Sequence, residues 1–176
     1  MIAMFVLSRD QTAQAVLPFD KNQFADELAK QQINQLYYSG QTGAGDELAL
    51  SAQSAVEGFD GQKMLEMRAV SASIKGKNGL EIEATAQFGQ YLYSEKLLKM
   101  TGAVLISSSS GYKLSSPELR ILIDGTYIFG EGPIEGLSPM GKIYAGRMEI
   151  TRKNAKAPMQ LWFGEKVVLD YEPSEI

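Results

Sequence analysis

The feature that most constrains the fold of this chain is an alternation of apolar and polar side chains with a period of two, which runs from Glu47 almost to the end of the sequence. Successive side chains of a β-strand point to opposite faces, so this alternation is typical of strands with one buried face. The alternation is clearest in the segments 48–53, 80–87, 98–107, 119–124, 159–163 and 166–171. Turn-forming residues separate them, at 58–61, 77–79, 107–111, 124–125 and 130–133. Many short strands at this spacing predict an all-β fold: an antiparallel sandwich, roll or barrel.

A weak internal repeat accompanies the alternation. The segments that begin at Glu47, Gly79, Gly111 and Gly141 resemble one another at a spacing of about 32 residues. A unit of this length holds two strands and their turns, and stacked units bury a continuous core that one unit cannot bury alone. Unless such a stack closes into a barrel, it exposes a free strand edge at each end. Pro117 lies inside one strand-like stretch and has no N–H to donate, so it fits only an edge, a bend or a bulge.

Histidine and cysteine are both absent from the 176 residues. Their absence excludes disulfides, thiolate nucleophiles, Ser–His and Cys–His catalysis, and metal sites built from these ligands. Asp124, Glu131 and Glu135 are close in sequence around the predicted turn at 130–133, and paired carboxylates can hydrolyse glycosides. Nothing in the sequence marks them as buried or paired, so we interpret them as solvated. We predict that the protein is not an enzyme and holds neither a metal nor a cofactor.

The charge balance argues against nucleic acid as a partner. Lysine and arginine total 17 and aspartate and glutamate total 21, which gives a net charge of −4. Neutralisation of phosphates dominates nucleic-acid affinity and normally requires a basic face. No basic stretch occurs in this sequence.

The N-terminal part differs from the rest of the chain. The apolar run 1–7 is too short to span a bilayer, which takes roughly 20 residues. It is either a loose tail or added strand, or the outer end of a membrane helix whose upstream part is missing from this sequence. Asp20 is placed to cap a short helix over 21–32. We therefore predict an anchor end at 1–8, a linker with a short helix at 9–35, a β-domain at 36–172 and a tail at 173–176.

Two interpretations of the apolar inner face remain open at this point. Its Leu, Ile, Met and Val side chains form either an ordinary core or a hollow that holds apolar ligand chains. The eight methionines suit an adaptable apolar surface, although methionine is also a common core residue. The single tryptophan, Trp162, is interpreted as a core or edge anchor, with a sugar-stacking platform as the alternative.

Several segments resemble a known family. Residues 79–91 and 97–104 resemble a pattern of strand, Ala-rich turn, Gly-x-Tyr and Leu-x-Leu-x-Gly-x-Val, and residues 110–116 follow it. Residues 132–150 resemble the signature Gly-Pro-Val-Glu-Gly-x-x-Pro-x-Gly-x-x-x-Ala-Gly-x-x-x-Ile of LptC-type lipopolysaccharide export proteins. Residues 5–9 look like the end of the single membrane anchor of that family. The resemblance is best over 79–150, and residues 151–176 do not align with it.

This resemblance implies a twisted antiparallel β-jelly-roll, open along one side, at the periplasmic face of the inner membrane. LptC-type proteins accept lipopolysaccharide from the LptBFG ABC transporter and pass it to LptA, the next β-jelly-roll of the bridge. Acyl chains travel in the apolar interior while the sugars stay outside. Protomers join edge to edge, so a homodimer is also possible. The expected function is therefore that of a non-enzymatic carrier.

On this interpretation, ten apolar residues of the predicted strands line the lipid trough: Leu80, Ile82, Ala84, Leu98, Met100, Val104, Ile106, Leu119, Ile121 and Ile123. The last strand is predicted to dock the next protein of the bridge through Val167, Val168, Leu169, Asp170 and Tyr171.

Two alternatives compete with the carrier. One is a structural β-bridge or filament subunit that binds only protein, which would self-associate without lipid. The other is a carbohydrate-active enzyme or sugar-binding β-sandwich. This second alternative requires paired acids and an exposed aromatic platform, and the sequence shows neither pattern.

Overall fold

The computed structural model describes residues 33–59, 63–124, 127–152 and 157–171. The predicted anchor end at 1–8, the predicted helix at 21–32 and the predicted tail at 173–176 lie outside the described residues. Within those limits the chain is all β, and it contains no helix. No segment of the described residues is a helix with the length and hydropathy needed to cross a bilayer.

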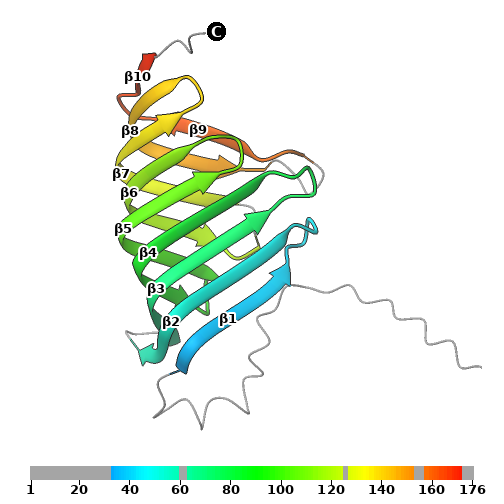
Figure 1. The fold of residues 1–176 in the computed structure, drawn as a ribbon. Helices are drawn as coiled ribbons and strands as arrows, with labels where there is room; N and C mark the ends of the chain where they lie inside the picture. Colours follow the sequence, from blue (N-terminus) through cyan, green and yellow to red (C-terminus); the bar gives the residue numbers. More distant parts are fainter. Residues whose placement is uncertain (1–32, 60–62, 125–126, 153–156, 172–176) are drawn as a thin grey trace, which may run out of the picture.

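The described residues form ten strands, which are joined into one antiparallel sheet (Figure 1). The strands are β1 (Ile33–Gln41), β2 (Glu47–Phe59), β3 (Lys63–Lys75), β4 (Glu81–Leu92), β5 (Leu97–Ser108), β6 (Lys113–Leu122), β7 (Tyr127–Ser138), β8 (Gly141–Thr151), β9 (Gln160–Gly164) and β10 (Val168–Tyr171). Neighbours in sequence are neighbours in the sheet from β1 to β8, and the short β9 and β10 both pair with β8. The sheet is open, with β1 at one end and β9 and β10 at the other.

The sequence repeat corresponds to hairpins. β2–β3, β4–β5 and β6–β7 are successive antiparallel hairpins, and β8 starts a fourth unit at Gly141. The β-domain begins with β1 at Ile33, three residues before the predicted start, and this strand carried no clear alternation in our sequence analysis. β1 is an edge strand in which no side chain is fully buried, so its pattern is weak.

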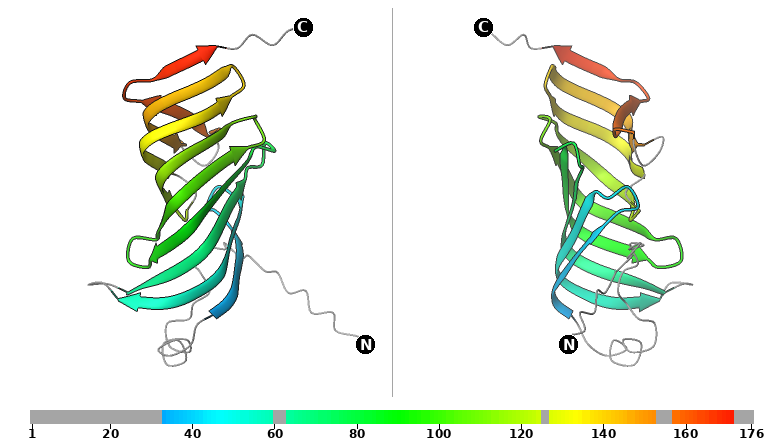
Figure 2. Two further views of the ribbon diagram at one scale, coloured as in Figure 1. Left: turned by 60° about the vertical axis from the view of Figure 1, so that its left-hand side comes forward. Right: turned by 90° about the vertical axis from the view of Figure 1, so that its right-hand side faces the viewer.

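A line of irregular residues, which we call the crease, crosses the sheet near the middle of the strands. Strand pairing is interrupted there from β1 to β8, and several crease residues have positive φ, such as Ala69 at 49° and Gly102 at 79°. The crease residues are Gln35, Gln53, Ala69, Gln87, Gly102, Ala103, Pro117, Gly132, Pro133 and Gly146. Bulges of this kind bend a strand and increase its twist. At the crease the sheet folds over, and Figure 2 shows it curling around its long axis.

The crease also changes which residues face inward. Buried positions are two residues apart along each half-strand. Across the crease they are three apart in β2, β3, β4, β6 and β8, as from Ala52 to Ala55, and four apart in β5 and β7, as from Met100 to Val104. The half-strands on either side of the crease form two layers, and both layers direct their apolar side chains toward the space between them. The result is one apolar cluster that extends from β2 to β8, with partly buried residues of β1 and β9 packed against it.

The prediction of a turn at 130–133 is wrong, because β7 runs through these residues without a break. Gly132 has a φ of 101°, and here the pairing register of β7 shifts against both of its neighbours, β6 and β8. Gly132 and Pro133 therefore form a bulge at the crease and not a hairpin turn. The expectation for Pro117 is confirmed, since it lies at a register shift between Ser115 and Glu118.

Replacing Gly132 with alanine is expected to destabilise the fold. A Cβ at this position would lie 2.6 Å from Cγ of Pro117, and the φ of Gly132 is unfavourable for L residues. Urea denaturation should show a loss of about 1–3 kcal/mol in the free energy of unfolding. Pro117→Ala in the same chain should recover part of this loss. Gly43→Ala is the control, because a Cβ at this position would meet nothing within 4 Å. Equal stability of the Gly132 and Gly43 variants would contradict the prediction.

Candidate functional site

The inner face between the two layers contains all ten residues predicted to line a trough. Nine of them are buried, and Leu80 is partly buried against the same cluster. The sequence prediction that these side chains share one face is therefore confirmed. What they line in this structure differs from one part of the interior to another.

The part of the interior beside the crease is closely packed. One row of register partners crosses the sheet on this side: Ala55, Met67, Gly89, Met100, Leu119, Gly130, Met148 and Phe163. The two glycines of this row, Gly89 and Gly130, each lie between two long side chains, and a Cβ on Gly130 would lie 3.2 Å from Cδ1 of Ile134 and 3.5 Å from Cε of Met148. The glycines thus give the long side chains room to interdigitate. Methionine side chains are flexible, so this packing can adapt to a change in shape.

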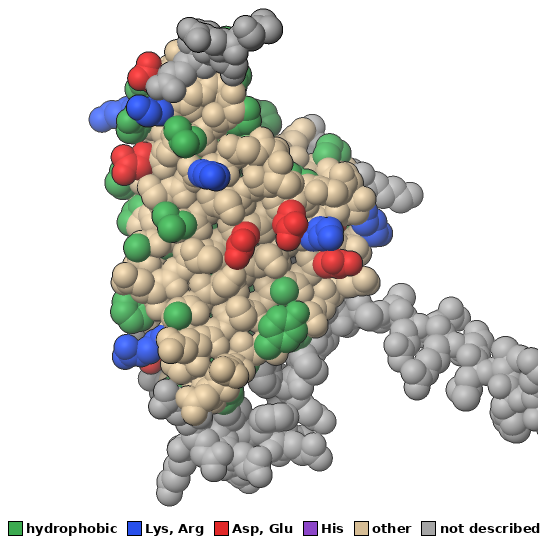
Figure 3. Space-filling model, in the orientation of Figure 1, with side chains coloured by type: hydrophobic (Ala, Val, Ile, Leu, Met, Phe, Trp, Pro, Cys, Tyr) green, Lys and Arg blue, Asp and Glu red, His purple; other side chains and the backbone are tan. Residues whose placement is uncertain are grey.

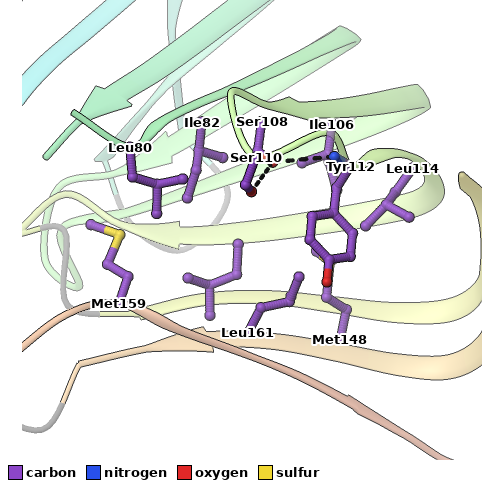
Figure 4. Close-up of a pocket in the computed structure, with 11 residues that line it drawn as sticks. Leu80, Ile82, Ile106, Ser108, Ser110, Tyr112, Leu114, Met148, Met159 and Leu161 are labelled. Atoms are coloured by element: carbon purple, nitrogen blue, oxygen red, sulfur yellow. Dashed lines mark hydrogen bonds between the residues drawn. The ribbon is translucent and has the colours of Figure 1, made fainter. Parts of the chain in front are cut away.

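A cavity of about 200 Å³ lies between the two layers, mostly farther from the crease, and it reaches the row at Met148 (Figure 4). One wall comes from the beginnings of β4 and β6 and the end of β5, and the other comes from β8, β9 and Met159. Of the predicted trough residues, Leu80, Ile82 and Ile106 line this cavity. A second space of about 20 Å³ is bordered by Ile82 and by Leu98, Ile121 and Ile123. The remaining four, Ala84, Met100, Val104 and Leu119, line neither space.

Hydroxyl groups lie at one side of the larger cavity. Ser108 and Ser110, from the turn between β5 and β6, line it, and their Oγ atoms are 2.7 Å apart. The backbone N–H of Tyr112 donates to Oγ of Ser108 at 3.4 Å. In the same turn, Oγ of Ser109 accepts a hydrogen bond from the backbone of Glu81. Sequence analysis treated 107–111 only as a turn and therefore missed these residues; the run of four serines was the available signal.

The carboxylates considered for glycoside hydrolysis do not form a buried pair. Asp124, Glu131 and Glu135 are all exposed, as the sequence predicted. Glu131 lies 3.8 Å from Nη2 of Arg120, which is a surface contact. Among the described residues there is no group of acidic side chains that could hold a metal ion.

The outer surface carries charges of both signs, and in the view of Figure 3 neither sign gathers into a large patch. Glu118 contacts Lys99 at 3.0 Å and Arg120 at 2.7 Å. Burial acts to raise the pKa of Glu118, but the hydrogen bonds and positive charges of these two side chains outweigh it and lower that pKa. Trp162 is 59% exposed on the outer side of β9, so it is an edge residue and does not belong to the core.

Three tyrosines gather near the β1 end of the interior. Tyr91 and Tyr93 make an edge-to-face contact with ring centroids 5.1 Å apart. Burial, followed by the proximity of Tyr93 and Tyr38, raises the pKa of Tyr91 to about 12. A neutral phenol is therefore favoured in the fold, and its contribution to stability is present below pH 10 and lost as the pH rises toward 12. This group acts as part of the apolar packing.

The strand predicted to dock a partner is at the free C-terminal end of the sheet. Among the described strands, β10 pairs only with β8, and its four residues are exposed. Val167, just before it, is exposed as well. The uncovered residues thus include the apolar Val168 and Leu169 beside an unpaired backbone edge. Free edges of this kind are able to accept a further strand.

These features define a class of protein: an open β-jelly-roll made from a single folded antiparallel sheet, with an apolar interior and two free edges. A family model described as "Lipopolysaccharide-assembly, LptC-related" matches residues 44–160. The chain belongs to this family, which ties it to lipopolysaccharide transport. The match covers β2 to β8 and ends at the first residue of β9. No curated protein matches the chain.

Proposed function

We propose that this protein is a non-enzymatic carrier of lipopolysaccharide in the periplasmic bridge. It accepts lipopolysaccharide from the inner-membrane transporter LptBFG and passes it to LptA. Residues 1–8 belong to an N-terminal anchor that keeps the domain at the periplasmic face of the inner membrane. The observation that carries the proposal is the apolar interior of the folded sheet, with an unfilled cavity beside a row of hydroxyl groups.

The physical basis of transport is the burial of acyl chains. Each Å² of apolar surface removed from water contributes about 25 cal/mol, so a chain that moves along a continuous apolar interior keeps most of this benefit. The cavity of about 200 Å³ is smaller than a typical small-molecule site of about 300–1,000 Å³. Entry of a lipid therefore requires the two layers to separate. The crease joins the layers through the backbone, and the methionine-rich row beside it can repack as the layers move.

Transfer to the next protein uses the free edge of β10. A strand of LptA pairs with β10, so that the sheet and the apolar interior continue from one protein to the next. The exposed apolar side chains of β10 are covered in that complex. Pairing of two such edges would also produce a homodimer.

A structural bridge subunit that binds only protein is the second candidate. Two observations favour it: the exposed β10 edge and the close packing of the interior beside the crease. This candidate shares the docking edge with the carrier but leaves the interior closed.

A photo-crosslinking experiment in cells separates the two. A benzoylphenylalanine in place of Leu161 points into the larger cavity, whereas the same group at Trp162, the next residue of β9, lies on the outer surface. We expect a lipopolysaccharide adduct from position 161 and little or none from position 162. An adduct at neither position, together with protein adducts from β10, would favour the structural bridge. Fractionation of the same cells tests the proposed location at the inner membrane.

A further inference from the structure

A buried ion pair connects two parts of the sheet that are far apart in strand order. Nη2 of Arg152 lies 2.7 Å from Oδ2 of Asp46, and the two side chains are 7% and 3% exposed. Asp46 is in the turn between β1 and β2, and Arg152 directly follows β8. Since β2 and β8 are separated by five strands of a continuous sheet, the pair forms only because the layers fold toward each other. It is therefore a polar clasp between the layers.

Both charges continue inward-facing rows of apolar side chains. Asp46 is two residues before Leu48, which borders the smaller space, and Arg152 is two residues after Ile150, which lines the larger cavity. Asp46 directly precedes β2 and Arg152 directly follows β8. The alternation of these strands, extended by one residue, places both buried side chains on the inward side, at the border of the apolar interior and outside the lining of the two spaces. An apolar row that ends in the positive charge of Arg152 is complementary to an amphiphile: the row can contact the acyl chains, and the charge can contact an anionic head group.

Asp46 contacts only part of the guanidinium of Arg152. Within the part of the chain that the structure describes, Nε of Arg152 is buried and has no hydrogen-bond partner. Nε and Nη2 lie on the same edge of the planar guanidinium, and together they suit a bidentate anion. Oδ2 of Asp46 contacts Nη2 of this pair. Buried donors without a partner are costly, so an anion that reaches both nitrogens is favoured over the carboxylate.

Asp46 keeps other partners if Arg152 leaves it. The backbone N–H of Lys77 donates to Oδ1 of Asp46 at 3.4 Å, and Oγ1 of Thr42 lies 3.5 Å from Oδ2. The carboxylate is thus held in its turn by contacts that do not involve β8. Separation of the pair leaves the acidic side chain partly satisfied, while it frees a positive group beside the apolar interior.

We propose that Arg152 binds a phosphate group of the amphiphile whose acyl chains enter the interior, and that Asp46 occupies the guanidinium until this phosphate displaces it. The exchange opens the clasp as the lipid enters. This inference rests on the carrier function proposed above. It adds the residue that recognises the head group, and it predicts a preference for phosphorylated lipids.

The test compares binding of two lipids to the purified full chain: a phosphorylated lipopolysaccharide and the same preparation after enzymatic removal of its phosphates. We expect the wild-type protein to prefer the phosphorylated form by about tenfold or more, the range of a charge-assisted hydrogen bond. Arg152→Gln should abolish this preference, and its affinity for the dephosphorylated lipid should be no weaker than that of wild type, because the ion pair that closes the layers is already broken. Arg147→Gln, on the exposed outer side of β8, is the matched control.

A second variant keeps the test valid if Arg152→Gln does not fold. Asp46→Asn retains the guanidinium and removes its internal competitor, so it should bind the phosphorylated lipid several-fold more tightly than wild type. Its thermal unfolding temperature should also rise more on addition of that lipid. An unchanged affinity in this variant, or an unchanged preference in folded Arg152→Gln, overturns the inference.

The remaining outcomes separate this inference from the carrier function. Wild-type binding of both lipids with equal affinity would refute the role of Arg152 and leave the carrier function standing. Binding of neither lipid would refute the carrier function, and the inference with it. Inorganic phosphate alone provides the last arm: if it stabilises Asp46→Asn as strongly as the lipid does, the site binds free phosphate and the assignment to a lipid head group is overturned.

Discussion

Met100→Asp is expected to destabilise the domain severely. Met100 has no exposed surface and lies in the closely packed row beside the crease, between Gly89 and Leu119 in register. A carboxylate there would be buried without a partner, and the effective cost of burying an ion is several kcal/mol. Since small domains are stable by about 5–15 kcal/mol, we expect a loss of at least 4 kcal/mol in the free energy of unfolding. Urea denaturation followed by circular dichroism measures it.

Leu105→Asp is the matched control for this experiment. Leu105 lies on the same strand, β5, but its side chain is 59% exposed on the outer surface. We expect this variant to remain within about 0.5 kcal/mol of the wild-type protein. If Met100→Asp were as stable as Leu105→Asp, water would reach the row beside the crease, and the interior would be open without any separation of the layers.

A second large effect is expected at the C-terminal edge. If β10 is the docking edge proposed above, the double variant Val168→Asp/Leu169→Asp should weaken docking of the proposed partner LptA by about tenfold or more, because the paired edge would bury two charges. Both side chains are exposed in the free protein, so the free energy of unfolding should change little. Binding of purified LptA to the immobilised domain measures the effect.

Val56→Asp serves as the control for that measurement, since Val56 is an exposed apolar residue of β2, far from β10 in strand order. Equal binding of the control and the double variant would remove β10 from the docking surface. The contact would then involve another edge, such as β1 at the opposite end of the sheet.

The strands and hairpins were predictable because a half-buried strand leaves a period of two in the sequence. The predicted inner face of β4, β5 and β6 was confirmed for the same reason. The crease was not predicted, since the bulge shifts the alternation by only one residue in most strands, as from Met67 to Val70, and leaves it in phase in β5 and β7. The bulge at Gly132 was mistaken for a turn because glycine and proline are common to both structures.

The candidate site was only partly predictable. Apolar alternation identifies an inner face, but it does not show how much of the face is filled by side chains from the opposite layer. Met100 and Ile106 have the same pattern in sequence, yet only Ile106 lines the larger cavity. The Asp46–Arg152 pair depends on how far the sheet folds over, and this distance is set by all of the strands between them.

The crease gives the molecule a modular length. Because each hairpin crosses the crease at an equivalent place, each one contributes one bent slice of the interior. Insertion or loss of one such unit would lengthen or shorten the passage while the registration of the remaining slices is preserved. A gene that duplicates a hairpin can therefore change the span of the protein across an aqueous compartment without redesigning its interior.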